Sequence, residues 1–403
     1  MDTTTQVLTT MDTAAIGRLQ KLGIYAALAG AVVGGLGTVL NPAQLAPSLL
    51  IGFWFCIGLS LGCLSLLMMQ HMSGGQWGLV SRRIYEAGAR LLPFCLLLFI
   101  PVVLFIPKLY IWADPQIVAG DEILQHKAPF LNTKFFVIRA VVYFAVWLFC
   151  MWHLDRWSAG QDRGEVAVTE ADTRRFRVVS GPGLVFYVIL MSLASVDWAM
   201  SLEPHWYSTI YGFIQVTGQT LSALALGVAV LALLAPREPM THVLRGSHFH
   251  DLGKLMLAFV MLYAYLSFSQ FLIIWAGNLP EEIPYYLARI QNGWQPVTIF
   301  LVFGHFVLPF CLLLSRDLKR RPNLLARVAW FIVAIRLLTD IWLIAPPFNQ
   351  SGTPISLANV GIPLFLGGVW MWLFAQQLAK RPLVPVNDPF FKDMLLHGDE
   401  GGH

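Results

Sequence analysis

Residues 45–69 read LAPSLLIGFWFCIGLSLGCLSLLMM, a stretch of 25 residues without a charged side chain. A helix of about 20 residues crosses the ~30 Å hydrocarbon core of a bilayer, so this stretch is long enough to span it. Its apolar residues are continuous and do not alternate with polar ones, which disfavours a strand of a transmembrane β-barrel. A helix also satisfies its backbone hydrogen bonds internally, as lipid requires. We therefore predict a transmembrane α-helix here.

Nine more apolar runs of this kind lie on either side of the first. The ten predicted spans are Leu22–Leu40, Leu45–Met69, Leu91–Tyr110, Phe135–Trp152, Val179–Leu202, Ser208–Ala235, Leu252–Gly277, Gln295–Ser315, Leu324–Ala345 and Leu357–Gln377. The composition agrees, because only 12% of the 403 residues are charged and 57% are hydrophobic, and the mean hydropathy is +0.63. A soluble globular protein carries about 25% charged residues. These values exclude a soluble enzyme, a disordered chain and a nucleic-acid-binding protein, and they predict an all-α integral membrane protein with ten transmembrane helices.

Basic residues predict the orientation of these helices. Of the 27 Lys and Arg residues, 21 lie in the N-terminal segment, the C-terminal tail and the connections that follow the even-numbered spans. Five lie on the other side, and Arg336 lies inside a span. Cytoplasmic loops are enriched in Lys and Arg. We therefore expect both termini in the cytoplasm, with residues 1–21 as an N-terminal segment, residues 22–377 as the membrane domain and residues 378–403 as a C-terminal tail.

Short internal matches indicate a repeat of four helices. Gly52 and Gly58 in the second span recur 160 residues later as Gly212 and Gly218, and the Ile-Trp-Ala triplet at 111–113 recurs 163 residues later. The alternative is coincidence among apolar residues. The expected organisation is a first bundle at about 45–202, a second bundle at about 208–345, and flanking helices at 22–40 and 357–377.

Cysteine and histidine positions argue against a bound metal or haem. All five cysteines lie within predicted spans and none forms a Cys-x-x-Cys motif, so the ligand pattern of a structural zinc site, an iron–sulfur cluster or a c-type haem is missing. A b-type haem of the bis-histidine kind needs two imidazoles that face each other across a bundle, and His305 is the only histidine near the middle of a span. We expect no cofactor bound covalently or through a metal ligand, and a quinone is the one cofactor left open.

Polar side chains inside the spans are concentrated in the second bundle. Arg336 and Asp340 are four residues apart, and therefore on one face of a helix. A charge at bilayer depth costs at least about 2.5 kcal/mol and normally faces a bundle interior or a wet cavity. Carboxylate and imidazole groups relay protons, while Tyr, Ser and Gln order the waters between them. The candidate proton path consists of Asp197, Gln215, Gln219, Tyr263, Ser267, Gln270, His305, Arg336 and Asp340, with Glu203 and His205 as the proton exit at the outer rim.

The same polar pattern is compatible with a structural pair or with a transporter. The second and third spans hold only Ser60 and Ser65 at depth, so we expect a nearly dry first bundle. Arg336 and Asp340 can neutralise each other as a purely structural pair, although Arg before Asp is the weaker order along a helix and favours a partner elsewhere, such as Asp197. A secondary transporter for a small solute is the other class of function, but the expected matching helix breaks of the two halves are not seen.

Two blocks of sequence resemble a known family. The segment from Asp251 to Glu282 contains the elements DLG, YAY, FSQF, IW and NLPEE, and the segment from Asp197 to Gly212 contains DWAMSL, HW and STIYG. Both resemble the NrfD-like (polysulfide-reductase-type) membrane subunits, and among them the ActF-like quinone-binding subunit 2 of bacterial alternative complex III. The resemblance extends from about Leu22 to Arg381.

The resemblance implies a ten-helix subunit of a quinol:cytochrome c oxidoreductase in the bacterial cytoplasmic (inner) membrane, within a respiratory electron-transport chain. Its partners would be a sister NrfD-like quinol-oxidising subunit, an iron–sulfur subunit and multi-haem cytochrome c subunits, together with quinol and lipids. The haem and iron–sulfur centres belong to those partners, so this chain is not expected to be catalytic alone. Its expected contribution is proton translocation through the second bundle. Direct quinol binding is the alternative, since Asp197 matches an acidic position near the quinol site of the sister subunit.

Overall fold

The computed structural model describes residues 13–163, 170–349, 354–391 and 394. These residues form helices and no strand. Nine of the helices they form are long and apolar enough to cross a membrane, so the chain is a multi-pass, all-α membrane protein. The tenth predicted span, Leu324–Ala345, coincides with the 23-residue helix α18, which is not among the nine. The count of ten spans therefore stays a prediction.

Most predicted runs correspond to one long helix, and two correspond to broken ones. The long helices are α2 (Thr13–Leu40), α3 (Leu45–Ser73), α9 (Thr133–Asp162), α10 (Glu170–Trp198), α11 (Tyr211–Leu234), α13 (Gly246–Gly277), α18 (Pro322–Ile344) and α19 (Leu357–Ala379). The shorter ones are α4 (Gln76–Ala89), α5 (Leu92–Leu104), α6 (Ile106–Leu109), α7 (Pro115–Ala119), α8 (Glu122–Lys127), α12 (Met240–Val243), α14 (Pro284–Ile290), α15 (Gln295–Val302), α16 (Leu308–Leu314) and α17 (Arg316–Arg320).

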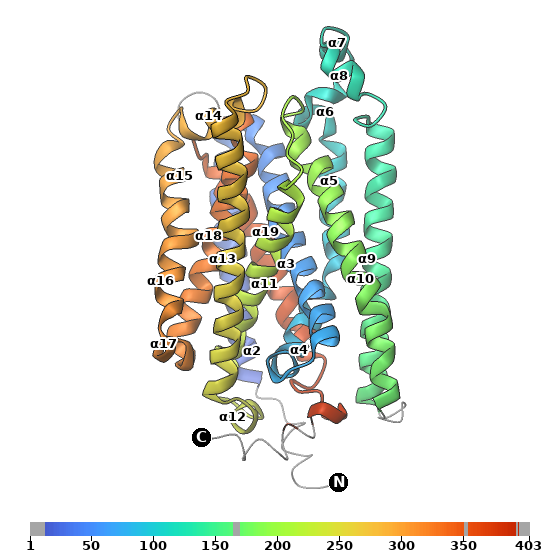
Figure 1. Ribbon diagram of the computed structural model, residues 1–403, viewed down its shortest axis with the longest axis vertical. Helices are drawn as coiled ribbons and strands as arrows, with labels where there is room; N and C mark the ends of the chain where they lie inside the picture. The colour runs from blue at the N-terminus through green and yellow to red at the C-terminus, as the bar shows by residue number, and fades with distance from the viewer. Residues whose placement is uncertain (1–12, 164–169, 350–353, 392–393, 395–403) are drawn as a thin grey trace.

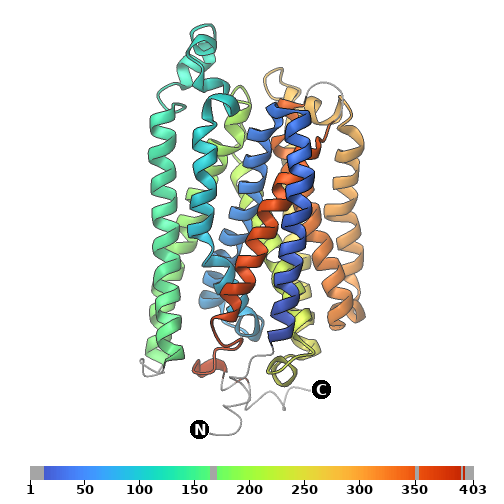
Figure 2. The ribbon, with the colours of Figure 1, turned by 180° about the vertical axis from the view of Figure 1, so that it is seen from behind.

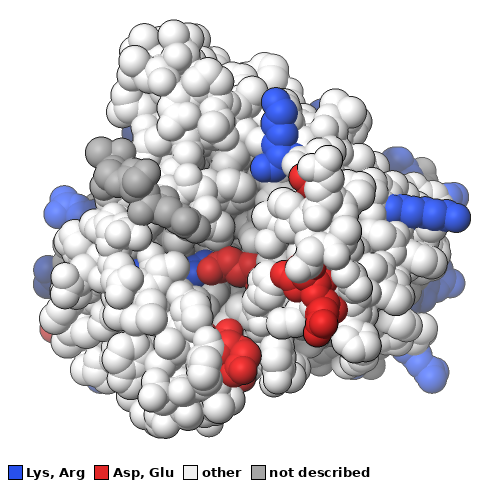
Figure 3. Space-filling model, turned by 90° about the horizontal axis from the view of Figure 1, so that it is seen from above, with Lys and Arg blue, Asp and Glu red and all other residues white. Residues whose placement is uncertain are grey.

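Two central helices, α3 and α11, contact each other and are buried along most of their length (Figure 1). Helices α5, α9 and α10 complete the first bundle around α3, and α13, α15, α16 and α18 complete the second bundle around α11. We call the end that holds α4, α12 and α17 the basic end, and the end that holds α7, α8 and α14 the opposite end. Figure 3 looks onto the opposite end and shows a mostly uncharged surface with a few acidic and basic groups.

The first and last long helices pack on each other behind the central pair (Figure 2). Glycines make their contact: a Cβ atom on Gly30 would lie 2.2 Å from the backbone nitrogen of Phe365, and one on Gly361 would lie 2.1 Å from that of Gly34. Such close backbone approach supplies van der Waals packing in lipid, where no hydrophobic force drives helices together. Because α2 and α19 are antiparallel, α2 begins and α19 ends at the basic end, which is the arrangement that two termini on one side of a membrane require.

The connection after the second predicted span is not the exposed loop that its arginines predicted. It forms α4, in which Arg82 and Arg83 are only 1% and 2% exposed. Glu86 makes this burial possible, because its two carboxylate oxygens lie 2.9 Å from Arg82 and 2.8 Å from Arg83. A buried charge persists only when it is paired and hydrogen-bonded. The count of basic residues predicted that these arginines lie at the same end as the other basic connections, but it did not predict that they are buried.

This cluster also shows that the expectation of a nearly dry first bundle was wrong. The hydroxyl of Ser158 on α9 donates a 2.6 Å hydrogen bond to Glu86. The C-terminal segment reaches the same cluster, because Asp388 Oδ2 lies 2.8 Å from Arg82 Nη1. Part of the predicted C-terminal tail therefore packs on the membrane domain. Residues 1–12 of the predicted N-terminal segment and 395–403 of that tail lie outside the described residues.

Candidate functional site

Arg336 and Asp340 form a buried pair on the face of α18 that packs against α11. Asp340 Oδ1 lies 2.9 Å from Arg336 Nη2, and the two side chains are 1% and 4% exposed. The same Nη2 donates a 2.8 Å hydrogen bond to Gln215 Oε1 on α11. The spacing of one helical turn thus brings the two charges together, as the sequence predicted, and Gln215 connects them to the central helix.

The pair retains unused hydrogen-bonding capacity. Within the described part of the chain, Asp340 Oδ1 and Arg336 Nη1 are buried and lack a hydrogen-bond partner. The short contact between the two side chains is therefore an attraction between charges that lacks the alignment of a hydrogen bond. Buried polar atoms normally find a partner in protein or ordered water. Arg336 Nη1 is therefore free to donate to a water molecule, and Asp340 Oδ1 is free to accept a hydrogen bond or a proton.

Gly218 on α11 makes room for the arginine. A Cβ atom at this position would lie 2.1 Å from Arg336 Nη1 and 3.1 Å from Tyr263 Cε2. The guanidinium therefore rests directly on the helix backbone, which only glycine permits here. In the sequence this residue served only as a marker of the internal repeat, and no local signal indicated that it faces an arginine 118 positions later in the chain.

His305 lies beside the pair in an irregular part of the helical run that includes α15 and α16. The segment Phe303–Val307 is a π-helix, and Pro309 has no N–H to donate to the carbonyl of His305, which interrupts the regular ladder. Such π-helical bulges often occur at functional sites. The His305 ring stacks on Tyr263 of α13, with ring centroids 4.2 Å apart, and neither of its nitrogens has a partner among the described residues.

A second set of polar groups lies further along α13, toward the opposite end. Gln270, seven residues after Tyr263 on α13, accepts a 2.8 Å hydrogen bond from Ser208 and donates a 3.1 Å bond to the hydroxyl of Tyr286. Burial raises the pKa of Tyr286 to about 12, so this tyrosine stays a neutral hydroxyl at physiological pH. Ser267 lies between Tyr263 and Gln270 in the sequence, and its buried hydroxyl has no partner in the described structure.

A second arginine, Arg289, lies beyond these polar groups. The rings of Tyr286 and Tyr285 are 5.2 Å apart, and Arg289 stacks at 3.5 Å on Tyr285. Arg289 Nη2 lies 2.6 Å from Glu203 Oε2. Glu203 was predicted as a proton exit at the outer rim, and the structure places it beside Arg289, next to these polar groups. His205 lies apart from it, since its Nε2 contacts Asp121 at 2.6 Å.

Toward the basic end, α11 and α18 become apolar a short distance from the pair. On α11, every residue from Ala223 to Leu234 is apolar, and the hydroxyl of Ser222 is already bonded to the carbonyl of Gly218. The buried residues of α18 on this side of Arg336 are also aliphatic. In the described residues of these two helices, the apolar stretch toward the basic end therefore begins after Ser222 on α11 and directly before Arg336 on α18.

Asp197 belongs to the first bundle and does not pair with Arg336, so that prediction was wrong. Its carboxylate accepts two hydrogen bonds from Arg139 of α9, at 2.9 and 2.7 Å, and a third at 2.7 Å from Tyr143. Arg139 was one of the five basic residues expected on the outer side of the membrane, so no buried partner was predicted for it. An aspartate and an arginine 58 residues apart give no local signal of their contact.

Gln219 is also separate from the pair. It lies one turn beyond Gln215 on α11, where Tyr187 of α10 donates to its Oε1 at 3.3 Å and its Nε2 lies 3.6 Å from Met191 Sδ. The side chain therefore fills the junction between the two bundles. Of the two predicted glutamines on this helix, only Gln215 contacts the charged pair.

No protein-family model matches the chain, and no curated protein is significantly similar to it. The described residues contain no group of three or more His, Cys, Asp and Glu side chains that could hold a metal ion. The chemistry of the site therefore follows from its own side chains. These supply a carboxylate, a guanidinium, an imidazole, and hydroxyl and amide groups, which together can hold water and move protons.

Proposed function

We propose that this chain is an NrfD-like membrane subunit of a bacterial quinol-oxidising complex of the alternative complex III type, and that its second bundle carries protons. The iron–sulfur and haem centres of such a complex would reside on partner subunits, and this chain would not be catalytic alone. The observation that carries the proposal is the buried Arg336–Asp340 pair with unused hydrogen-bonding atoms beside His305. The resemblance of the sequence supplies the class of complex.

In this proposal Asp340 is the group that gains and loses the proton. Arg336 Nη2 lies 2.9 Å from Asp340 Oδ1, so a movement of the guanidinium changes the charge that the carboxylate meets. His305, 4.2 Å ring to ring from Tyr263, offers a second acceptor next to the pair. Ordered water bridges such groups when each water finds two to four polar partners, and Asp340, Arg336, His305 and Ser267 supply them.

The direction of exchange follows from the asymmetry of the core. Between the pair and the opposite end lie the bonded polar groups Gln270 and Tyr286, and Glu203 lies beyond them. Toward the basic end, α11 beyond Ser222 and α18 before Arg336 bury apolar side chains. We infer that this conformation exchanges protons with the opposite end, and that access from the basic end requires a rearrangement in which α18 or the π-helical segment moves. A change in a neighbouring redox subunit would have to favour one of these two arrangements to drive transport.

The test compares Asp340→Asn with Thr339→Val in the intact complex in sealed vesicles. Thr339 is the neighbouring buried residue, and its hydroxyl is already bonded to the carbonyl of Ile335 at 2.9 Å, so its replacement controls for a change in the same turn. We expect Asp340→Asn to retain quinol oxidation and to lose proton translocation, and Thr339→Val to retain both. An unchanged proton-to-electron ratio in Asp340→Asn would return the pair to a structural role.

A further inference from the structure

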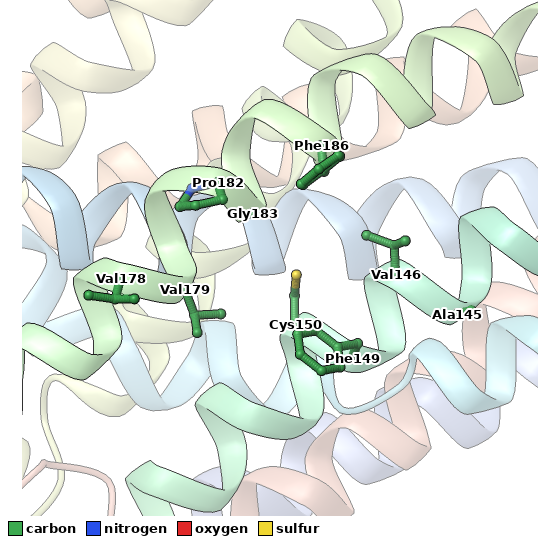
Figure 4. Close-up of a pocket in the computed structure, with 9 residues that line it drawn as sticks. All are labelled: Ala145, Val146, Phe149, Cys150, Val178, Val179, Pro182, Gly183 and Phe186. Carbon is green, nitrogen blue, oxygen red and sulfur yellow. The ribbon is translucent and has the colours of Figure 1, made fainter.

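A groove opens between α9 and α10 on the outside of the first bundle, at the side remote from the Arg336–Asp340 pair. It has a volume of about 470 Å³, and its walls are apolar side chains from both helices (Figure 4). Phe149 on α9 and Val178 and Phe186 on α10 are 56%, 63% and 51% exposed. In a membrane-spanning protein these side chains face lipid, so the groove is open to an acyl chain from the side.

The groove is built into the sequence of α10. Pro182 has no N–H to donate to the carbonyl of Val178, which interrupts the helical ladder and allows the helix to bend. Gly183 follows, and its missing side chain keeps the floor open: a Cβ atom there would lie 2.7 Å from Met68 Sδ and 3.4 Å from Cys150 Sγ. Cys150 on α9 belongs to the lining of this groove (Figure 4), and its sulfur suits an irregular apolar ligand.

Aromatic rings continue the groove along α9 toward the basic end. The ring of His153 lies 4.1 Å from that of Phe149, 4.7 Å from that of Trp152 and 5.7 Å from that of Trp157. Tryptophan is enriched at the level of lipid headgroups, where an apolar ring with a polar edge is favoured. These rings therefore mark the membrane interface one to two turns below the groove.

Arginines follow at the next level. Arg174 and Arg175 are exposed and precede Val178 and Val179 of the groove by one helical turn on α10. On α9, the guanidinium of Arg156 lies 5.2 Å from the ring of Trp152. In the part of the chain that the structure describes, no ion pair with a carboxylate involves these three arginines, whereas Arg82, Arg83, Arg90 and Arg381 at the same end each have one.

We propose that this surface binds an anionic glycerophospholipid from the leaflet at the basic end. One acyl chain lies in the groove, the glycerol region lies at the tryptophans, and the phosphate lies between Arg156, Arg174 and Arg175. The order of apolar, aromatic and cationic groups along the two helices matches the order of groups along such a lipid. A neutral lipid or a quinone tail would fill the groove but leave three cations without an anion, and basic pockets between helices on this side typically bind acidic headgroups.

The experiment titrates the purified full chain in detergent with phosphatidylglycerol or phosphatidylcholine of the same acyl chains, and native mass spectrometry counts the bound lipid. We expect tighter binding of phosphatidylglycerol. Because each Lys or Arg near an anionic headgroup contributes about fivefold in affinity, the double variant R174Q/R175Q should bind phosphatidylglycerol roughly 25-fold more weakly. Both arginines are exposed, so the fold should be retained.

Two further variants separate the headgroup from the chain. R316Q/R320Q removes the same charge from exposed positions at the basic end of the second bundle and should leave binding unchanged. V146F/V179F fills the groove and should weaken the binding of both lipids. Equal binding of phosphatidylglycerol by the wild type and R174Q/R175Q would overturn the proposal. So would an equal loss in R316Q/R320Q, which would show that only net charge matters, or unchanged binding in V146F/V179F.

Discussion

Each bundle contains an aspartate–arginine pair with a buried carboxylate, Asp197–Arg139 in the first and Asp340–Arg336 in the second, and the two pairs differ in how completely they are bonded. Asp197 receives two hydrogen bonds from Arg139 and one from Tyr143, and the pair joins α9 to α10. Asp340 and Arg336 lie on one helix and share a single 2.9 Å contact, and each keeps one buried atom without a partner among the residues that the structure describes. The first pair is a closed connection between helices. The second pair has hydrogen-bonding atoms that are still free, and a group that takes up a proton or exchanges its bonding partner requires such atoms.

The largest expected effect is the removal of the arginine from the closed pair. Arg139→Ala would leave a carboxylate that is 0% exposed with only a tyrosine hydroxyl. Breaking a buried pair in this way costs about 3–5 kcal/mol, so the yield of folded protein and its resistance to thermal unfolding should fall sharply. Lys134→Ala removes an exposed cation from the same helix and should have almost no effect. Equal stability of the two variants would mean that the Asp197 pair does not hold the bundle together.

Replacing each aspartate by asparagine tests the contrast directly. Asp197→Asn loses the two-fold bond to Arg139 and should destabilise the fold by about 3 kcal/mol, as the breaking of a buried pair does. Asp340→Asn should cost less, about 1–2 kcal/mol, because Arg336 keeps Gln215 Oε1 as an acceptor and the new amide oxygen can still accept. Unfolding by heat or denaturant in detergent measures both. A larger loss for Asp340→Asn would reverse the assignment of the two roles.

Two glycines at matching positions of the repeat sharpen the comparison. Gly218→Ala would place a methyl group 2.1 Å from Arg336 Nη1, and Gly58→Ala would place one 3.2 Å from Cγ of the flexible Gln219 side chain. Overpacking of a tight core costs about 1–3 kcal/mol. We expect Gly218→Ala to be destabilising and to impair proton translocation, because the guanidinium must shift away from Asp340. Gly58→Ala should be milder in stability and should leave translocation intact. Equal effects of both would indicate general crowding of the central helices.

The smallest effect is expected at an exposed pair, where water replaces the protein as a partner. Asp121 accepts from the backbone N–H of Leu124, and its other oxygen lies 2.6 Å from His205 Nε2. These bonds, the one to Leu124 first, lower the pKa of Asp121 below its usual value. A lowered pKa stabilises the fold above the unfolded value of about 3.9, and this contribution is lost as pH falls through the folded value.

Hydrogen exchange of the α8 amides should therefore stay slow from neutral pH to about pH 5 and become faster below about pH 4, after correction for the intrinsic rate. The variant Asp121→Asn keeps a side-chain oxygen for the helix cap but cannot titrate, so its exchange should show no such step. Exchange in α8 that is independent of pH in the wild type would contradict this role of Asp121.

The two aspartate pairs also show which part of the site the sequence could predict. Arg336 and Asp340 are one turn apart, and a helix of known period places such residues on the same face. The hydrogen bond of Arg336 to Gln215 and its contact with Gly218 join positions more than a hundred residues apart, and the Arg139–Asp197 pair joins positions 58 apart. No periodicity connects residues on different helices, so these partners could be found only in the folded chain.

Burial at the basic end was hidden for the same reason. Hydropathy placed Arg82 and Arg83 outside the membrane core because it scores each side chain without its partners. Glu86, Ser158 and the distant Asp388 neutralise or bond these arginines, which removes most of the penalty for burying a charge. The cluster therefore depends on three segments that meet only after the helices have packed.

By itself the sequence determined that this is a helical membrane protein, and it located the apolar helices. Both properties are sums over neighbouring residues, because transfer into lipid and helix formation depend on local composition and period. Only the tertiary structure decided which carboxylate each arginine meets and which polar side chains of different helices bond to one another. Those properties depend on the packing of helices against one another, where a distance of a few ångströms separates a closed ion pair from one with capacity to spare.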